Sequence, residues 1–216
     1  NAMLQNWDSS VYGYFVFYPY GARRIVTIAG TNLPCAVDAP YGAGRIFATL
    51  QPVEWVFASQ DYLENMLLYA GYNNVAILQD RIPWVNYVTN ATYQNGMNER
   101  VLASNFIAYT IFGTSEMRFV DYSPYDKVIV AGDQGSNFYA QLGLMLTQLT
   151  LYASSGGLLD LHLAASSSEQ INRYIYPGGF SLASFSSENV NIVDPGARIL
   201  NVPNVITKTM LTNWSF

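Results

Sequence analysis

Short apolar runs alternate with segments of helical spacing through the middle of the chain, and no other pattern in the sequence narrows the fold as much. Residues 74–78 are an apolar run followed at once by polar Gln79 and Asp80, as expected for a buried parallel strand. Further strands are predicted over 116–120, 125–131 and 158–163, and helices over 91–112 and 137–153. Strands that alternate with helices predict a parallel sheet with right-handed crossovers, and therefore the α/β fold class.

The two ends of the chain have a different pattern. Four short strands are predicted over 14–17, 24–28, 35–38 and 45–49. Turn signals at Gly21, Gly30 and 42–44 separate them, which favours an added antiparallel meander. A helix over 53–69 follows, and residues 166–187, rich in Ser, Gly and Tyr, are expected mainly as loop.

The composition excludes several classes of protein. Half of the 216 residues are hydrophobic and 12% are charged, whereas disordered chains have few apolar residues and much charge. No apolar run approaches the roughly 20 residues that a membrane-spanning helix needs, so no membrane span is expected. The formal net charge is -5 and the only lysines are Lys127 and Lys208, so the clustered positive charge that nucleic-acid binding requires is lacking.

The surface must be wetted largely by Tyr, Asn, Ser, Thr and Gln, because charged residues are scarce. Seventeen tyrosines and little lysine favour an extracellular or cell-surface location. Cys35 is the one cysteine and His162 the one histidine, which argues against an internal disulfide, a thiolate metal site and a polyhistidine zinc site. Neither a metal nor a cofactor is therefore expected.

A five-residue match links the two ends of the chain. Residues 3–7, Met-Leu-Gln-Asn-Trp, recur as residues 210–214, Met-Leu-Thr-Asn-Trp, with one mismatch. The match is stronger evidence for a repeated or permuted unit when the two ends of the chain are joined, so that residues 74–214 come before residues 7–72.

Three stretches carry a family resemblance in this circular order. Residues 149–162 read as a helix, a Gly-Gly turn and a strand ending in histidine, residues 194–199 read Asp-Pro-Gly-Ala-Arg-Ile, and residues 41–49 begin Tyr-Gly-Ala-Gly-Arg. The sequence so ordered resembles the class I glutamine amidotransferase-like superfamily, particularly its trehalose-utilisation (ThuA-like) branch. The resemblance implies a flavodoxin-like, mainly parallel sheet flanked by helices in a single domain over 1–216. In it, 7–72 supplies the C-terminal part of the fold and 74–214 the N-terminal part.

The order of the segments departs from that of the family, because the element expected last stands first. Either the domain is circularly permuted, or the chain is cut across the junction between tandem repeats. A permutation closed within one chain predicts that Trp7 and Trp214 lie near a common surface, with the termini close together. If the N-terminal strands pack on a neighbouring copy instead, the partners are adjacent repeats or the second copy in a swapped homodimer.

Candidate functional residues gather where the parallel strands end, because ligands of such sheets bind beyond the carboxyl ends of the strands. Asp80 follows the first central strand, Asp133 and Gln134 follow the third, and His162 ends the fourth. Asp160 points to the same sheet face as His162 and could orient its ring or cap a neighbouring helix. His162 itself is either a general base or a histidine that hydrogen-bonds a loop and closes the end of the sheet.

Residues 132–136, Gly-Asp-Gln-Gly-Ser, form a glycine-bracketed turn that enters a helix, with Ser136 as the expected N-cap. Backbone amides there, with Gln134 and Ser136, could bind an anion or another polar ligand. The turn lacks the lysine and the spacing of a phosphate loop, and simple turn chemistry is the alternative. Glu54 is expected in the first turn of the helix over 53–69, where it suits the helix dipole. Arg45 is expected to hold a carboxylate or a carbonyl.

Cysteine chemistry is missing from the expected place. The resemblance implies a nucleophilic cysteine on a tight strand-to-helix turn, with His and Glu partners. The strand that ends at His162 instead continues through residues 163–166, Leu-Ala-Ala-Ser. Cys35 lies in a predicted meander strand and is expected to be a small buried hydrophobe. Glutaminase activity is therefore not expected.

Two functions remain in view. The first is a catalytically silent amidotransferase-like domain, a binding or architectural module of a larger surface or secreted protein. The alternative is a carbohydrate-acting or carbohydrate-binding domain of the ThuA-like type, with tyrosine and tryptophan rings available for sugar stacking. The residues assigned to catalysis are His162, Asp133 and Asp160, and those assigned to ligand binding are Asp80, Gln134, Ser136, Glu54 and Arg45. An active site requires the histidine and nearby carboxylates to converge on one pocket, which distinguishes the two functions.

Overall fold

The structure, a computed structural model, describes residues 11–55, 60–69, 73–84, 96–165 and 171–212. Within these ranges eight strands form one mixed sheet in the order β10-β2-β3-β4-β8-β7-β5-β6, and β1 pairs with β9 in a second, two-stranded sheet. The strands are β1 (Val11–Phe17), β2 (Arg23–Ile28), β3 (Pro34–Tyr41), β4 (Gly44–Thr49), β5 (Asn74–Leu78), β6 (Ala108–Phe112), β7 (Lys127–Val130), β8 (Leu158–His162), β9 (Ser181–Ser187) and β10 (Val190–Ile192). The helices are α1 (Gln60–Leu67), α2 (Met97–Ser104) and α3 (Ser136–Ser154), with 3-10 turns at Met117–Phe119, Pro177–Gly179, Arg198–Leu200 and Lys208–Leu211. The α/β fold class predicted from the sequence is confirmed.

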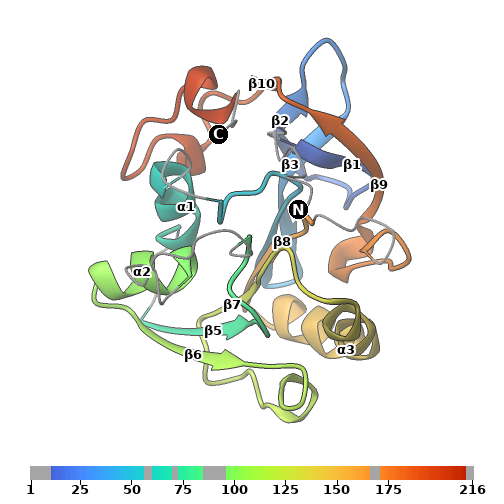
Figure 1. Cartoon of the computed structure of the whole chain (residues 1–216), viewed down its shortest axis with the longest axis vertical. Helices are drawn as coiled ribbons and strands as arrows, with labels where there is room; N and C mark the ends of the chain where they lie inside the picture. Colours follow the sequence, from blue (N-terminus) through green and yellow to red (C-terminus); the bar gives the residue numbers. More distant parts are fainter. Residues whose placement is uncertain (1–10, 56–59, 70–72, 85–95, 166–170, 213–216) are drawn as a thin grey trace, which may run out of the picture.

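The parallel half of the sheet has the order β4-β8-β7-β5-β6. Every residue of β7 is buried, as are the last four residues of β5 and of β8. Figure 1 shows why: α1 and α2 lie on one side of these strands and α3 lies on the other. A strand that is covered on both faces needs a continuous apolar run, which is the pattern that predicted these three strands.

The antiparallel half of the sheet extends from β4 through β3 and β2 to β10. The turn between β3 and β4 approaches the end of α3 closely, since a Cβ at Gly44 would overlap the carbonyl oxygens of Ala153 and Gly157. The first of the four predicted N-terminal strands, β1, lies outside this sheet and pairs with β9. Residues 166–187, expected mainly as loop, therefore contain a strand, although 166–170 lie outside the described residues.

Two predicted elements in the middle of the chain are wrong. The helix expected over 91–112 is described from Met97 and ends at Ser104, and the part over Ala108–Phe112 is the edge strand β6. Phe106 has a φ of 58°, a left-handed conformation that ends helical geometry and turns the chain into β6. The strand expected over 116–120 is a 3-10 turn, in which the amide of Phe119 donates to the carbonyl of Glu116, three residues earlier.

The predicted helix starts also need correction. The helix expected over 53–69 is α1, which begins at Gln60, and Val53 to Trp55 form a turn before it. For α3 the N-cap is Gly135, no side chain caps the helix, and Ser136 is an exposed helical residue. Residues 3–7 and 213–214 lie outside the described residues, as does the predicted proximity of Trp7 and Trp214.

Candidate functional site

The carboxyl ends of β4, β8, β7 and β5 lie along one edge of the sheet. Thr49 at the end of β4 is in register with His162 at the end of β8, and the parallel pairing continues to β7 and β5. Gln79, Gly132 and Glu54 follow β5, β7 and β4, respectively. This edge is where ligands of open parallel sheets bind.

His162 and Glu54 form a buried pair at this edge. Nδ1 of His162 lies 2.9 Å from Oε1 of Glu54, and each side chain is 1% exposed. The amide of Asn98, in the first turn of α2, donates to the same Oε1 at 2.6 Å, and the backbone amide of Gly132 donates to Oε2 at 2.8 Å. Glu54 thus joins the ends of β4, β7 and β8 to α2.

Gly132 is required by the close approach of this carboxylate. A Cβ at residue 132 would lie 2.6 Å from Oε2 of Glu54 and 3.0 Å from the carbonyl oxygen of Ala164. Only a residue without a side chain lets the strand end approach Glu54 closely enough to donate its amide hydrogen.

Buried polar atoms without a hydrogen-bond partner gather among the side chains at this edge. Nε2 of His162 has none among the described residues, although Nδ1 of the same ring is held by Glu54. Glu99 accepts from Gln79 through Oε1 at 2.7 Å, while its Oε2 and the Oε1 of Gln79 have none within the described ranges. The side-chain oxygen of Asn98 and both side-chain polar atoms of Gln51 also lack a hydrogen-bond partner among the described residues. Such groups are rare in protein interiors and demand an explanation, because an unmade hydrogen bond is costly.

Asp133 adopts a left-handed conformation with a φ of 46° on the tight turn between β7 and α3. Its Oδ2 lies 3.2 Å from Nη2 of Arg81 and accepts the backbone amide of Trp84 at 3.3 Å. Gln134 ties the same turn to the loop after β5: its Oε1 accepts the amides of Asp80 and Arg81, at 2.9 and 3.0 Å. These contacts make Asp133 and Gln134 anchors between two neighbouring loops.

Of the other predicted site residues, Asp80 and Asp160 bind partners other than His162, and Ser136 is exposed. Asp80 accepts the backbone amide of Thr114 at 2.6 Å and also the hydroxyl of that residue. Asp160, expected to orient the ring of His162, instead binds Nζ of Lys127 at 2.5 Å, and Glu54 holds the ring. Ser136 is exposed at the start of α3.

Arg45 lies at the amino ends of the parallel strands, whereas His162 lies at their carboxyl ends. It is the second residue of β4 and is in register with Leu158, the first residue of β8. It forms an ion pair of 3.4 Å with Asp38 and stacks over the ring of Tyr69, 5.7 Å from the ring centre. Burial raises the pKa of Asp38, and the Arg45 guanidinium opposes that shift. Arg45 does hold a carboxylate, but not one at the candidate site.

Five buried polar residues were not identified as candidates by the sequence. Asn98, Glu99, Gln51 and Gln79 join the edge described above, and Lys127 pairs with Asp160. The sequence did indicate Gln79 as a residue of the strand end, since it directly follows the apolar run over 74–78. Asn98 and Glu99 fell inside a predicted helix, where polar residues normally indicate a solvent-facing side.

Cys35 is buried in β3, and burial raises the pKa of its thiol. The described residues contain no group of three or more His, Cys, Asp or Glu side chains placed to hold a metal ion. No helix in the described ranges has the length and apolar character to cross a membrane.

Comparisons with known proteins give one distant neighbour. No family model matches the sequence, and no curated protein matches it. A solved structure with a similar course of the chain is the IMPa metallopeptidase from Pseudomonas aeruginosa, with 14% sequence identity and a TM-score of 0.45. The match covers 97% of this chain and 23% of that chain. A likeness at this level carries no information on function.

Proposed function

We propose that this chain is a catalytically silent amidotransferase-like domain that serves as a binding or architectural module of a larger surface or secreted protein. In this proposal the parallel half of the sheet is a flavodoxin-like fold. The segment before the first helix adds antiparallel strands to it. The proposal also includes the inverted order of segments 7–72 and 74–214, by permutation or by a repeat junction. Its partners are then neighbouring repeats or a second, swapped copy, together with a carbohydrate or another small polar ligand.

The observation that carries the proposal is the residue on the turn between β7 and α3. Enzymes that form covalent acyl intermediates place the nucleophile on a strained strand-to-helix turn of this kind, next to a histidine. Here that turn carries Asp133 with its φ of 46°, and the carboxylate is bound to Arg81 and to the amide of Trp84. The one thiol of the chain is on Cys35, in the interior of β3. Neither Asp133 nor Cys35 therefore supplies the nucleophile of an acyl-enzyme pathway.

A glutaminase assay tests this proposal. Purified protein is incubated with glutamine, and the release of glutamate and ammonia is followed against a His162→Ala variant. A chloroketone analogue of glutamine, followed by intact-mass analysis, searches for a covalent adduct. We expect no turnover above the variant and no adduct on the folded protein. Glutamine turnover that disappears in His162→Ala, or a single stoichiometric adduct, would overturn the proposal.

The unpartnered Nε2 of His162 favours one second function, a carbohydrate-acting site. In the tautomer that carries its proton on Nδ1, His162 donates to Glu54 and the buried Nε2 keeps a lone pair. That lone pair accepts the proton of a ligand hydroxyl only if the ligand reaches this buried edge of the ring. The carboxylate of Glu54 would then stabilise the imidazolium, because it lies 2.9 Å from Nδ1. In this function His162 is the general base and Glu54 its positioning residue.

The pH dependence of glycoside hydrolysis tests this second function. Trehalose and nitrophenyl glycosides are the probes, and wild type is compared with His162→Gln and with Glu54→Gln. Activity that requires His162, together with an altered pH profile in Glu54→Gln, supports catalysis. Hydrolysis that is equal in all three proteins would exclude it, as would saturable sugar binding without turnover, which supports the module instead.

A further inference from the structure

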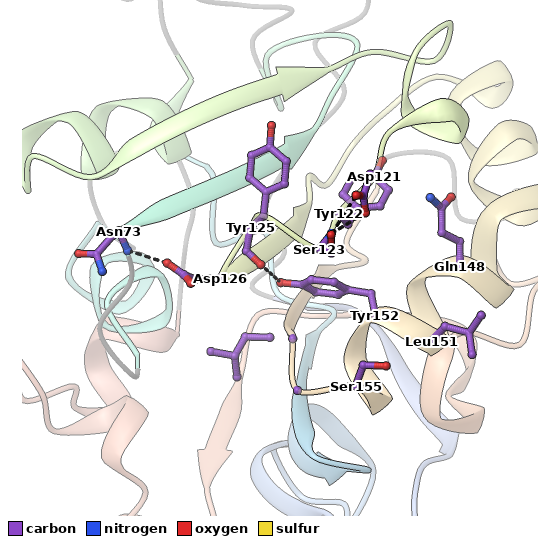
Figure 2. Close-up of a pocket in the computed structure, with 13 residues that line it drawn as sticks. Asn73, Asp121, Tyr122, Ser123, Tyr125, Asp126, Gln148, Leu151, Tyr152 and Ser155 are labelled. Carbon is purple, nitrogen blue, oxygen red and sulfur yellow. Dashed lines mark hydrogen bonds between the residues drawn. The ribbon is translucent and has the colours of Figure 1, made fainter.

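A cavity lies at the amino ends of the parallel strands, whereas His162 lies at their carboxyl ends. Its volume is about 640 Å³, and its lining comes from the residues that precede β5, β7 and β8, from the loop over 121–126 and from the last turns of α3. Figure 2 shows the ring of Tyr152 in the middle of this lining, with Asp126 on one side and Asp121 and Gln148 on the other.

The cavity is negatively charged. Asp121 and Asp126 line it, and its described lining contains no Lys, Arg or His. Hydrogen bonds from the backbone amide and the hydroxyl of Ser123 lower the pKa of Asp121, which is therefore ionised at neutral pH. A ligand with negative charge is disfavoured here, because no cationic group of the lining could compensate it.

Most hydrogen-bond donors of the lining are already used within the protein. The amide of Gln148 donates to the carbonyl of Val120 at 2.6 Å, and the hydroxyl of Tyr152 donates to the carbonyl of Tyr125 at 3.1 Å. Acceptors remain: among the described residues no donor reaches Oε1 of Gln148 or Oδ1 of Asp126. These free acceptors favour a ligand that supplies donors. An ammonium group offers three donors and no acceptor, whereas each hydroxyl of a neutral sugar offers one donor and two acceptor lone pairs.

Apolar surface lies between the two carboxylates. The ring of Tyr152 packs directly over Gly157, where any Cβ would overlap it. Leu151, one residue earlier on α3, is 62% exposed and lines the same cavity. An aromatic ring beside carboxylates attracts cations through its quadrupole, and its face also accepts methylene groups.

We propose that this cavity binds a linear organic diamine or polyamine. One ammonium group donates to Asp126, another donates to Asp121 and Gln148, and the methylene chain lies against Tyr152 and Leu151. Charge-assisted hydrogen bonds at both ends select the spacing of the amines as well as their charge. This site is separate from the His162 edge and does not depend on the function proposed for it.

Calorimetric titration of the whole chain tests the proposal, with 1,4-diaminobutane and spermidine as probes and 1,4-butanediol as the uncharged match. We expect saturable one-to-one binding of the amines in 150 mM salt and no heat from the diol. Because the protein is acidic, nonspecific attraction must be separated from binding in the cavity. Equal binding of the diol, or amine binding without saturation, overturns the proposal.

Two pairs of variants locate the site. Leu151→Lys places an ammonium in the cavity, whereas Leu144→Lys adds the same charge to the same helix at a residue that is 63% exposed and outside the lining. Asp126→Asn removes a lining charge, and Glu188→Gln removes an exposed charge elsewhere. The first member of each pair should weaken amine binding about tenfold or more and the second should not, given the strength of charge-assisted hydrogen bonds. Equal effects within the Leu151 and Leu144 pair, whose exposed positions tolerate lysine, would sink the proposed site.

Discussion

Nζ of Lys127 lies 2.5 Å from Oδ2 of Asp160, and the two side chains are 1% and 6% exposed. The same ammonium donates to the carbonyl oxygens of Met66 and Leu67, at 2.7 and 3.4 Å, where α1 ends. Burial lowers the pKa of Lys127, while the carboxylate of Asp160 opposes that shift. The pair therefore ties the start of β7 and the middle of β8 to the carboxyl end of α1, where a positive charge also suits the helix dipole.

We expect Lys127→Met to lower the free energy of unfolding by about 3 to 5 kcal/mol, because it leaves the carboxylate of Asp160 buried without its counter-charge. Urea unfolding followed by circular dichroism measures this. The double variant Lys127→Met/Asp160→Leu should recover most of the loss, since it buries no uncompensated charge. A single variant as stable as wild type would contradict the buried ion pair.

Gly132→Ala is expected to destabilise the protein by about 1 to 3 kcal/mol, as overpacking of a close contact does. The new Cβ would stand 2.6 Å from Oε2 of Glu54 and so displace the carboxylate that holds His162. Nitrogen chemical shifts of the His162 ring should change together with the stability.

Gly196→Ala is the matched control for that change. A Cβ at residue 196 would find its nearest neighbour, Oδ1 of Asp194, 3.9 Å away, and the residue is exposed. This variant should leave both the stability and the His162 signals as in wild type. If the two alanine variants behave alike, Gly132 does not set the position of Glu54.

The accuracy of the sequence predictions follows the burial of each element. Strands β5, β7 and β8 are covered on both faces, so their apolar runs appear directly in the sequence. Strand β6 is at the edge of the sheet, and its residues are exposed or half-buried. Its five residues therefore carry no burial pattern that distinguishes a strand from the end of a helix.

The candidate site was predicted in part, for a related reason. The sheet edge and His162 follow from the strands, because parallel strands end together. The partner of His162 could not be predicted from the strands, because Glu54 is 108 residues away in the sequence. The position of Glu54 after Pro52 instead suggested the start of a helix. Likewise Lys127 and Asp160 share a sheet face only once the register of β7 against β8 is known. Contacts between distant segments depend on register, which local patterns do not contain.

Cys35 is expected to be unreactive in the folded protein. Burial in β3 raises the pKa of the thiol, and the thiolate is the reactive form. An aromatic disulfide reagent at pH 8 should release no colour from native protein over minutes and one equivalent per chain in concentrated urea. Rapid labelling without denaturant would place the thiol at the surface and reopen cysteine chemistry for this domain.

Tyr62 provides a prediction about alkaline pH. Its ring on α1 is 1% exposed, its hydroxyl has no hydrogen-bond partner within the described residues, and burial raises its pKa above the ordinary value of 10.0. In the unfolded chain the phenol loses its proton near pH 10, whereas in the folded chain it stays neutral. Unfolding therefore releases a proton above pH 10, so this group contributes stability that is complete below that pH and lost as the pH rises.

Tyr62→Phe should behave differently on the two sides of pH 10. At pH 7 the variant is expected to be as stable as wild type or more stable by about 1 kcal/mol, because it removes a buried hydroxyl without a partner. Above pH 10 its stability should fall less steeply than that of wild type, by up to about 1.4 kcal/mol per pH unit, which is the effect of one proton. Tyr20→Phe is the control, since that ring is fully exposed and its loss should change neither value. Urea unfolding at pH 7, 9, 10 and 11 measures both variants, and equal alkaline slopes for Tyr62→Phe and wild type would show that the phenol ionises freely in the folded protein.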